Sequence, residues 1–184
     1  VCGSTFAANN TIQNVILNEV STLSTSTKSF ITDPKKKNTV LNDNNAIDIF
    51  IENNTESYLA LQLINVASDK LGTGYRSGGT TPAGFDCSGL MYSTFKKFDI
   101  TLPRSSHEMA EIGTEINPED AKKGDLIFFI NRGQRRINHV GMIVEVNGDE
   151  IKFIHSSTQG GVIISSLKES YYERTFKQIN RIIE

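Results

Sequence analysis

The sequence predicts an α+β fold in which N-terminal helices precede a mostly antiparallel sheet. Segments with helical apolar spacing come first, and five short apolar runs with strand character follow them. This order is typical of helices that pack on a single sheet. Between the first two helices, residues 72–84 contain five Gly and one Pro, too many for a helix, and they lead to a helix that begins near Cys87. We therefore expect Cys87 at a helix start that packs on the sheet.

Three helices are expected before the strands. The first starts near Glu56 and stops at Gly72, with an apolar stripe that consists of Ala60, Leu63, Ile64, Ala67 and Leu71. The buried face of the second consists of Leu90, Thr94, Phe95 and Phe98. Ser105 and Glu108 form the capping-box pattern of a short third helix that ends at Gly113. Strands are expected at residues 126–130, 140–146, 151–155, 162–164 and 177–183.

The composition fits one domain with an additional polar segment. The chain has 184 residues, of which 38% are hydrophobic, and this suits one core of ordinary size. A formal net charge of -2 provides no field that would attract nucleic acid, so we expect no such partner. No apolar run approaches the ~20 residues that span a bilayer. We expect a monomer that needs no cofactor.

Residues 1–54 have the composition of a polar leader or tether, and we place the domain boundary between residues 54 and 55. This segment contains ten Asn and twelve Ser or Thr residues, which is typical of a solvated stretch. Helical spacing predicts one short amphipathic helix within it, formed by Ile12, Val15, Ile16, Val20 and Leu23. Docking of this helix on the folded domain as a lid is the alternative to a free tether.

A cysteine and two histidines form a candidate catalytic set. Cys87 lies at a helix start, where free backbone N–H groups and the helix dipole stabilise a thiolate, so we expect a lowered thiol pKa. His139 is the expected general base and acid, and His155 is the expected orienting group. The alternatives are buried core residues and a zinc site with these three ligands. We favour thiol catalysis without a metal, and we interpret His107 as a surface residue.

The two histidines share a sheet face only if the connection between their strands has the right parity. A two-residue turn at Asn147-Gly148 directs His139 and His155 to opposite faces. A three-residue turn at Asn147–Asp149, or a bulge, places them as diagonal neighbours on one face, about 7–8 Å apart. The catalytic hypothesis therefore requires the three-residue turn or a bulge.

Several sequence blocks occur in the order seen in one enzyme family. They are Tyr75–Gly79, Phe85–Leu90, Leu102–Ser106, Gly124–Phe129 and the two segments that contain His139 and His155. Together they closely resemble the NlpC-type family of papain-like bacterial cell-wall cysteine peptidases. The resemblance covers residues 56–184 and implies a papain-like fold over the 55–184 domain.

The resemblance also implies an activity. We expect a cysteine endopeptidase that hydrolyses peptidoglycan stem peptides at the bond between γ-D-glutamate and the following diamino acid, through a thioester acyl-enzyme. The alternatives are a papain-like amidase or acyltransferase that acts on another amide or ester, and a non-catalytic wall-binding module. The expected location is the bacterial cell envelope, either periplasmic or membrane-anchored, or the secreted fraction.

Residues near the cysteine are implied to bind substrate. In the family, the positions of Tyr75, Asp86 and Ser88 line the pocket for the substrate's amino end. The backbone N–H of Cys87 is the expected oxyanion donor, with the Tyr75 hydroxyl as a second candidate. Asp86 also fits a helix cap. Arg104 either meets a substrate carboxylate or forms a structural ion pair.

The second cysteine, Cys2, is a candidate for lipidation. If Cys87 stays free, Cys2 has no partner within the chain for a disulfide. Cys2-Gly3-Ser4 followed by a polar stretch resembles the start of a bacterial lipoprotein. The alternative is an incidental cysteine. A lipid on Cys2 is the one membrane contact that we expect.

Overall fold

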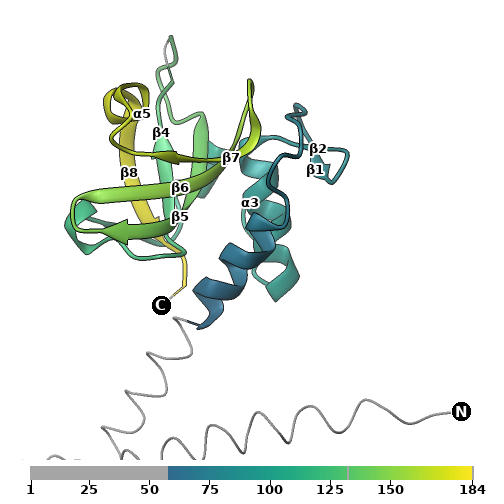
Figure 1. Cartoon of the computed structure of the whole chain (residues 1–184), viewed down its shortest axis with the longest axis horizontal. Helices are drawn as coiled ribbons and strands as arrows, with labels where there is room; N and C mark the ends of the chain where they lie inside the picture. The colour runs from purple at the N-terminus through teal and green to yellow at the C-terminus, as the bar shows by residue number, and fades with distance from the viewer. Residues whose placement is uncertain (1–57, 132, 184) are drawn as a thin grey trace, which may run out of the picture. The chain divides into compact units, whose positions relative to one another are not determined.

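A computed structural model of the protein describes residues 58–131 and 133–183. The described part combines helices with a six-stranded sheet (Figure 1), which confirms the predicted α+β class. The first described helix covers residues 58–68, and α3 covers Cys87–Phe95. The boundary expected at 54/55 and the helix expected around Ile12 to Leu23 lie outside the described residues. No helix in the described part of the chain is long and apolar enough to cross a membrane.

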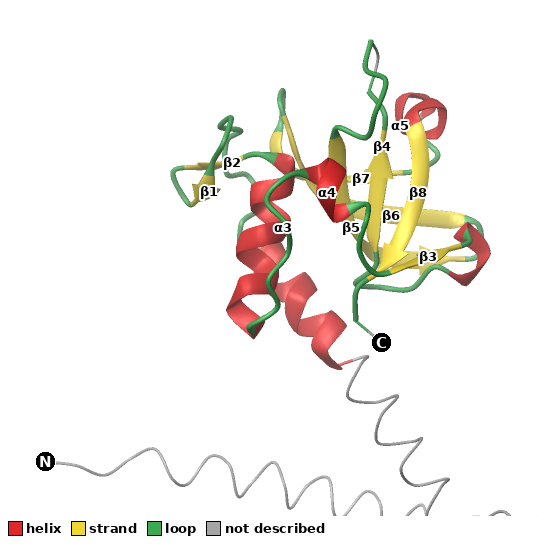
Figure 2. Cartoon of the chain, turned by 180° about the vertical axis from the view of Figure 1, so that it is seen from behind, coloured by secondary structure: helices red, strands yellow, loops and turns green. Residues whose placement is uncertain are grey.

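The sheet is antiparallel throughout, with the strand order β3-β8-β4-β5-β6-β7. Its strands are β3 (Thr114–Ile116), β4 (Leu126–Phe129), β5 (His139–Asn147), β6 (Glu150–Ser157), β7 (Gly161–Ser166) and β8 (Phe176–Arg181). Figure 2 shows α3 and the helix of residues 58–68 on one side of this sheet. All five predicted strands are present with shifted ends, and β3 is an additional one.

Short elements connect the larger ones. Residues 72–85 include two paired strands, β1 (Thr80–Thr81) and β2 (Gly84–Phe85). Helix α4 (Ser106–Met109) has the predicted capping box but ends before Gly113. The other short elements are η2 (Lys96–Phe98), η3 (Pro118–Asp120) and α5 (Ser170–Thr175). The sequence patterns did not predict α5, and this helix contributes to the candidate site.

Both faces of the sheet are covered, because alternate residues of its central strands belong to two separate clusters. Leu126 and Phe128 of β4 pack with Leu90 and Phe95 of α3. Ile127 and Phe129 pack on the other face with Tyr172 of α5. This double burial explains why β4 is apolar at every position. Leu71, expected in a buried stripe, is 46% exposed instead because the first helix ends at residue 68.

The connection between β5 and β6 places His139 and His155 on one face. The strands pair as Asn147 with Glu150, so the turn is Gly148-Asp149 and neither expected turn is present. A register shift between Ile143 and Glu145 then corrects the parity. The histidine pair was predicted to require either a three-residue turn or a bulge, and the structure has the bulge.

Candidate active site

The start of α3 is built from a capping aspartate and a tightly approached glycine. Asp86 is the N-cap residue, and its Oδ1 accepts a hydrogen bond from the Gly89 N–H at 2.6 Å, which confirms the predicted cap. A Cβ on Gly89 would lie 2.0 Å from the Gly79 carbonyl oxygen. Gly89 therefore lets the glycine-rich segment pack directly against the first turn of α3, with Cys87 at the turn's beginning.

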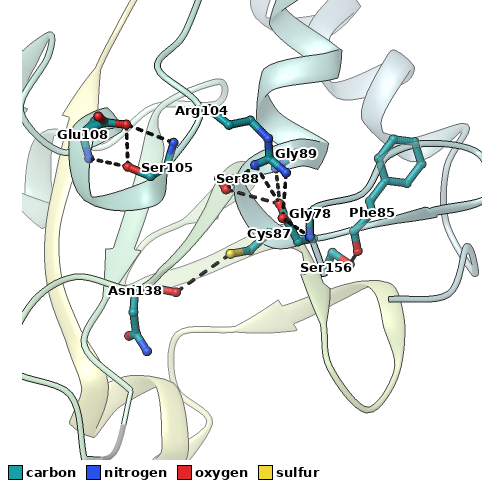
Figure 3. Close-up of polar contacts among 11 residues, drawn as sticks. Gly78, Phe85, Cys87, Ser88, Gly89, Arg104, Ser105, Glu108, Asn138 and Ser156 are labelled. Carbon is teal, nitrogen blue, oxygen red and sulfur yellow. Dashed lines mark hydrogen bonds and ion pairs between the residues drawn. The ribbon is translucent and has the colours of Figure 1, made fainter. Parts of the chain in front are cut away.

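The Asp86 carboxylate is the centre of a hydrogen-bond network, and Figure 3 labels its partners Gly78, Ser88, Gly89 and Arg104. Arg104 donates from Nη1 to Oδ1 at 3.0 Å and from Nη2 to Oδ2 at 2.7 Å. The Gly78 N–H and the Ser88 hydroxyl also donate to this carboxylate, and Arg104 donates to Ser88 Oγ at 2.8 Å. Burial acts to raise the pKa of Asp86, but the hydrogen bonds from Arg104, Gly89 and Gly78 outweigh it and lower the pKa. Arg104 thus forms the bidentate ion pair that the sequence left as one of two options.

The Cys87 sulfur lies against the backbone at the start of β5. Its Sγ donates to the Asn138 carbonyl oxygen at 3.9 Å (Figure 3), one residue before His139. Burial and the negative charge of Asp86 raise the thiol pKa, while backbone N–H groups, that of Val140 foremost, act in the opposite direction. The expected lowering of this pKa is therefore wrong for the protein without substrate, because burial outweighs the helix start.

His139 and His155 form a buried hydrogen-bonded pair. The distance from His139 Nε2 to His155 Nδ1 is 3.0 Å, and the ring planes are nearly perpendicular at 85°. Burial lowers the pKa of His139 to about 4. Burial and the charge of His139 lower the pKa of His155 to about 3. Both rings are consequently neutral near pH 7, and the hydrogen bond to His155 uses Nε2 of His139 and leaves its Nδ1 outside the pair.

Two hydroxyl groups contact the other nitrogen of His155. Ser165 Oγ of β7 lies 3.2 Å from His155 Nε2, and the Tyr172 hydroxyl of α5 lies 3.1 Å from it. Sequence reasoning missed both residues. Ser165 follows the predicted end of its strand by one residue, and α5 has no apolar stripe that would have predicted it.

Tyr75 lies beside the start of α3. It forms an isolated bridge with Phe85, and its side chain is 37% exposed. Burial raises its pKa; the Cys87 sulfur, when ionised, and the Asp86 carboxylate raise it further, while Arg104 acts to lower it. This electrostatic influence agrees with a phenol close to the thiol, and the oxyanion role of Tyr75 stays a prediction.

The structure thus joins the predicted residues in two groups that meet at the backbone of residues 138–140. Asp86, Ser88 and Arg104 surround the cysteine at the helix start, and the histidine pair lies on the strands. His107 is exposed and pairs with Glu111 at 3.5 Å, so it is a surface residue. Within the described residues, no group of three or more His, Cys, Asp or Glu side chains could hold a metal ion. Cys2 lies outside the described residues.

A helix that begins at a cysteine, packed on an antiparallel sheet whose neighbouring strands carry a histidine pair, is the papain-like α+β arrangement. The chain belongs to the NlpC/P60 family, whose sequence profile matches residues 72–181.

Relatives and solved structures share this domain. A probable endopeptidase NlpC homolog of Haemophilus influenzae is 47% identical over 122 residues, which are 66% of this chain and 62% of the relative. The murein DD-endopeptidase MepS/murein LD-carboxypeptidase of Escherichia coli K12 is 36% identical over 123 residues, with the same coverage of 66% and 62%. The match thus spans under two thirds of each relative. The crystal structure of an NlpC/P60 family protein from Bacillus cereus has a TM-score of 0.63 and 33% identity, over 68% of this chain and 40% of that one.

Proposed function

We propose that the protein is a cysteine endopeptidase that hydrolyses peptidoglycan stem peptides. Family membership and the endopeptidase names of the two relatives support the reaction class, and the murein in the name of the Escherichia coli relative supports the substrate. The observation that carries the proposal is the 3.0 Å hydrogen bond between the His139 and His155 rings. His139 begins β5, and the residue just before it, Asn138, contacts the Cys87 sulfur through its carbonyl oxygen. In this arrangement Cys87 would act as the nucleophile, His139 as the base and His155 as the orienting group.

The reaction would proceed through a thioester. Cys87 Sγ attacks the scissile carbonyl carbon while its proton passes to His139, and the Cys87 N–H and Tyr75 hydroxyl stabilise the oxyanion. Collapse of this intermediate expels the amine, which takes the proton from His139. Water then attacks the thioester carbonyl carbon and gives a proton to His139. Breakage of the C–S bond releases the carboxylic acid, and the departing sulfur takes the proton from His139 to restore the thiol.

The resting enzyme holds a neutral thiol and a neutral imidazole. The raised pKa of Cys87 and the lowered pKa of His139 both favour this neutral pair. Proton transfer from sulfur to His139 therefore accompanies the attack on a bound substrate, instead of preceding substrate binding.

We propose that the cleaved bond joins γ-D-glutamate to the diamino acid and that the substrate's amino end lies near Tyr75, Ser88 and Asp86. The Asp86 carboxylate already accepts five hydrogen bonds, whereas ~4 lone-pair sites are usual. Tyr75, which is partly exposed, is therefore the better direct contact. Asp86 would act through its charge and by holding Ser88 in place. Arg104 would support the pocket through its ion pair with Asp86, and the alternative role of Arg104 is to bind a substrate carboxylate.

A second candidate bond is the crosslink between stem peptides. The Escherichia coli relative is called a DD-endopeptidase and an LD-carboxypeptidase, so its name points to other bonds of the same polymer. Both candidates use the same residues and differ only in how the stem peptide lies in the site.

Mass spectrometry of muropeptides tests the proposal. Purified peptidoglycan digested by the wild-type chain should yield fragments cut after γ-D-glutamate, and the Cys87→Ala variant should yield none. Fragments separated at the crosslink would favour the second candidate. Intact muropeptides after prolonged digestion, with the wild-type chain folded, would reject hydrolysis of the wall.

We propose a cell-envelope or secreted location, with a possible lipid anchor on Cys2 and residues 1–54 as the tether. Support comes from the sequence resemblance and from the name of the Escherichia coli relative, which refers to murein. Cells that express the native precursor should incorporate palmitate into the protein, and Cys2→Ala should abolish the label. An unlabelled native protein in the soluble fraction would reject the anchor.

A further inference from the structure

The outer nitrogen of His155 is enclosed by two buried hydroxyl groups from separate elements. Tyr172 of α5 and Ser165 of β7 contact the same atom, Nε2, at 3.1 and 3.2 Å. Their residues are 8% and 6% exposed, and His155 is fully buried. The two hydroxyl oxygens thus converge on one ring nitrogen from β7 and α5.

The proton positions along this chain of groups determine whether His139 can act as a base. To accept a proton on Nδ1, neutral His139 must carry its own proton on Nε2 and donate it to His155 Nδ1. His155 must then carry its proton on Nε2, and that N–H needs an acceptor oxygen. In the opposite arrangement, His155 donates from Nδ1, His139 carries its proton on Nδ1, and the nitrogen available to Cys87 has no lone pair.

We propose that Tyr172 and Ser165 are positioning residues that hold His155 in the tautomer protonated on Nε2 and thereby keep His139 ready to accept the Cys87 proton. This inference rests on the proposed thiol mechanism. A ring nitrogen has one lone pair and accepts one hydrogen bond, whereas a single N–H can be shared between two acceptors, so two oxygens at 3.1 and 3.2 Å from Nε2 fit an N–H at this position. A buried N–H without an acceptor is unfavourable, so the pair of oxygens favours this tautomer.

Because His155 is fully buried, protein groups must supply the hydrogen-bond partners of its ring nitrogens. A buried neutral imidazole carries one proton, and the low pKa of His155 keeps it in that state near pH 7. Aromatic rings fix the ring plane, since Phe153 and Tyr172 lie 5.1 and 5.3 Å from the His155 ring centroid. With the ring held in place, the hydrogen-bond partners of its two nitrogens decide where the proton resides.

Packing alone does not require the hydroxyl of Tyr172, because a phenylalanine would fill the same space. The neighbouring Tyr171 provides a matched control, since its ring packs on Tyr172 at 5.2 Å but its side chain is 40% exposed. Ser165→Thr keeps a hydroxyl, whereas Ser165→Ala removes it.

The test compares Tyr172→Phe, Ser165→Ala, their double variant and the Tyr171→Phe control. Imidazole ¹⁵N chemical shifts report the tautomer of His155, and steady-state kinetics on muropeptides separate kcat from KM. We expect each single change to lower kcat less than about tenfold, because one acceptor remains, and the double change to lower it ~10²-fold or more with KM nearly unchanged. Ser165→Thr in the Tyr172→Phe background should keep the activity of Tyr172→Phe.

The ¹⁵N spectrum separates failure of this inference from failure of the proposed function. Wild-type His155 should be protonated on Nε2 even if no muropeptide is cleaved, and the double variant should shift toward Nδ1 protonation. If the double variant unfolds, the single variants decide, because each should already show a partial shift that Tyr171→Phe lacks. Protonation of wild-type His155 on Nδ1, or a tautomer unchanged in every folded variant, would overturn the inference.

Discussion

Mild acid is expected to destabilise the domain, because it charges two buried imidazoles. The pKa of His139 is lowered from 6.5 to about 4 and that of His155 to about 3. The unfolded chain therefore binds more protons than the folded one below pH 6.5, and the stability present above this pH is lost as the pH falls toward 4. At pH 5, linkage gives a loss of roughly 2 kcal/mol for each histidine, or about 4 kcal/mol together. That is a large share of the ~5–15 kcal/mol typical of a domain.

Urea unfolding followed by circular dichroism at pH 7.5 and pH 5.0 measures this loss. The double variant His139→Gln and His155→Gln should lose much less stability than the wild type between the two values. Carboxylates with lowered pKa, such as Asp86, remain ionised at pH 5 and contribute little in this range. His107→Gln, a change in an exposed side chain, serves as the control. A wild-type loss below about 1 kcal/mol, or an equal loss in the double variant, would refute the assignment of two buried neutral histidines.

Three further outcomes follow from the site. His139→Ala should lower kcat by about 10²–10⁴-fold because it removes the proton carrier, whereas His155→Gln should keep measurable turnover; wild-type kinetics for His155→Ala would remove His155 from the site. Gly141→Ala should destabilise the domain by ~1–3 kcal/mol, since the added Cβ would lie 2.7 Å from the Phe153 ring and 2.9 Å from a backbone oxygen. The control is Gly74→Ala, whose added Cβ would have no neighbouring atom within 4 Å. Equal melting temperatures for the two variants would contradict this prediction. Asp86→Asn should impair cleavage of stem peptides with a free amino end more than of N-acetylated ones, and equal impairment would leave Asp86 only its capping role.

The sequence predicted the helix start at Cys87 well because its signals are local. Asp86 caps the helix and the glycines before it exclude a longer helix, so the start of α3 at Cys87 follows from neighbouring residues. The strands were also predictable, since β4 and β5 are continuously apolar where both faces of the sheet are covered.

The features that the sequence missed depend on contacts between distant residues. The bulge between Ile143 and Glu145 arises from pairing with β6 and has no local signal. Tyr172 reaches His155 from a six-residue helix that is too short to show a periodic stripe. The raised pKa of Cys87 likewise reflects burial against β5, which the helix-start argument did not include.

Site-resolved alkylation tests most directly the central claim that Cys87 carries out the chemistry as a thiol. The protein is treated with iodoacetamide for increasing times, the modified fraction of Cys87 is measured by peptide mass spectrometry, and muropeptide cleavage is measured on the same samples. Activity should fall in proportion to Cys87 modification and reach zero when modification is complete, while EDTA should leave activity unchanged. Full modification of Cys87 with activity retained, or activity abolished by EDTA and restored by zinc, would contradict the claim.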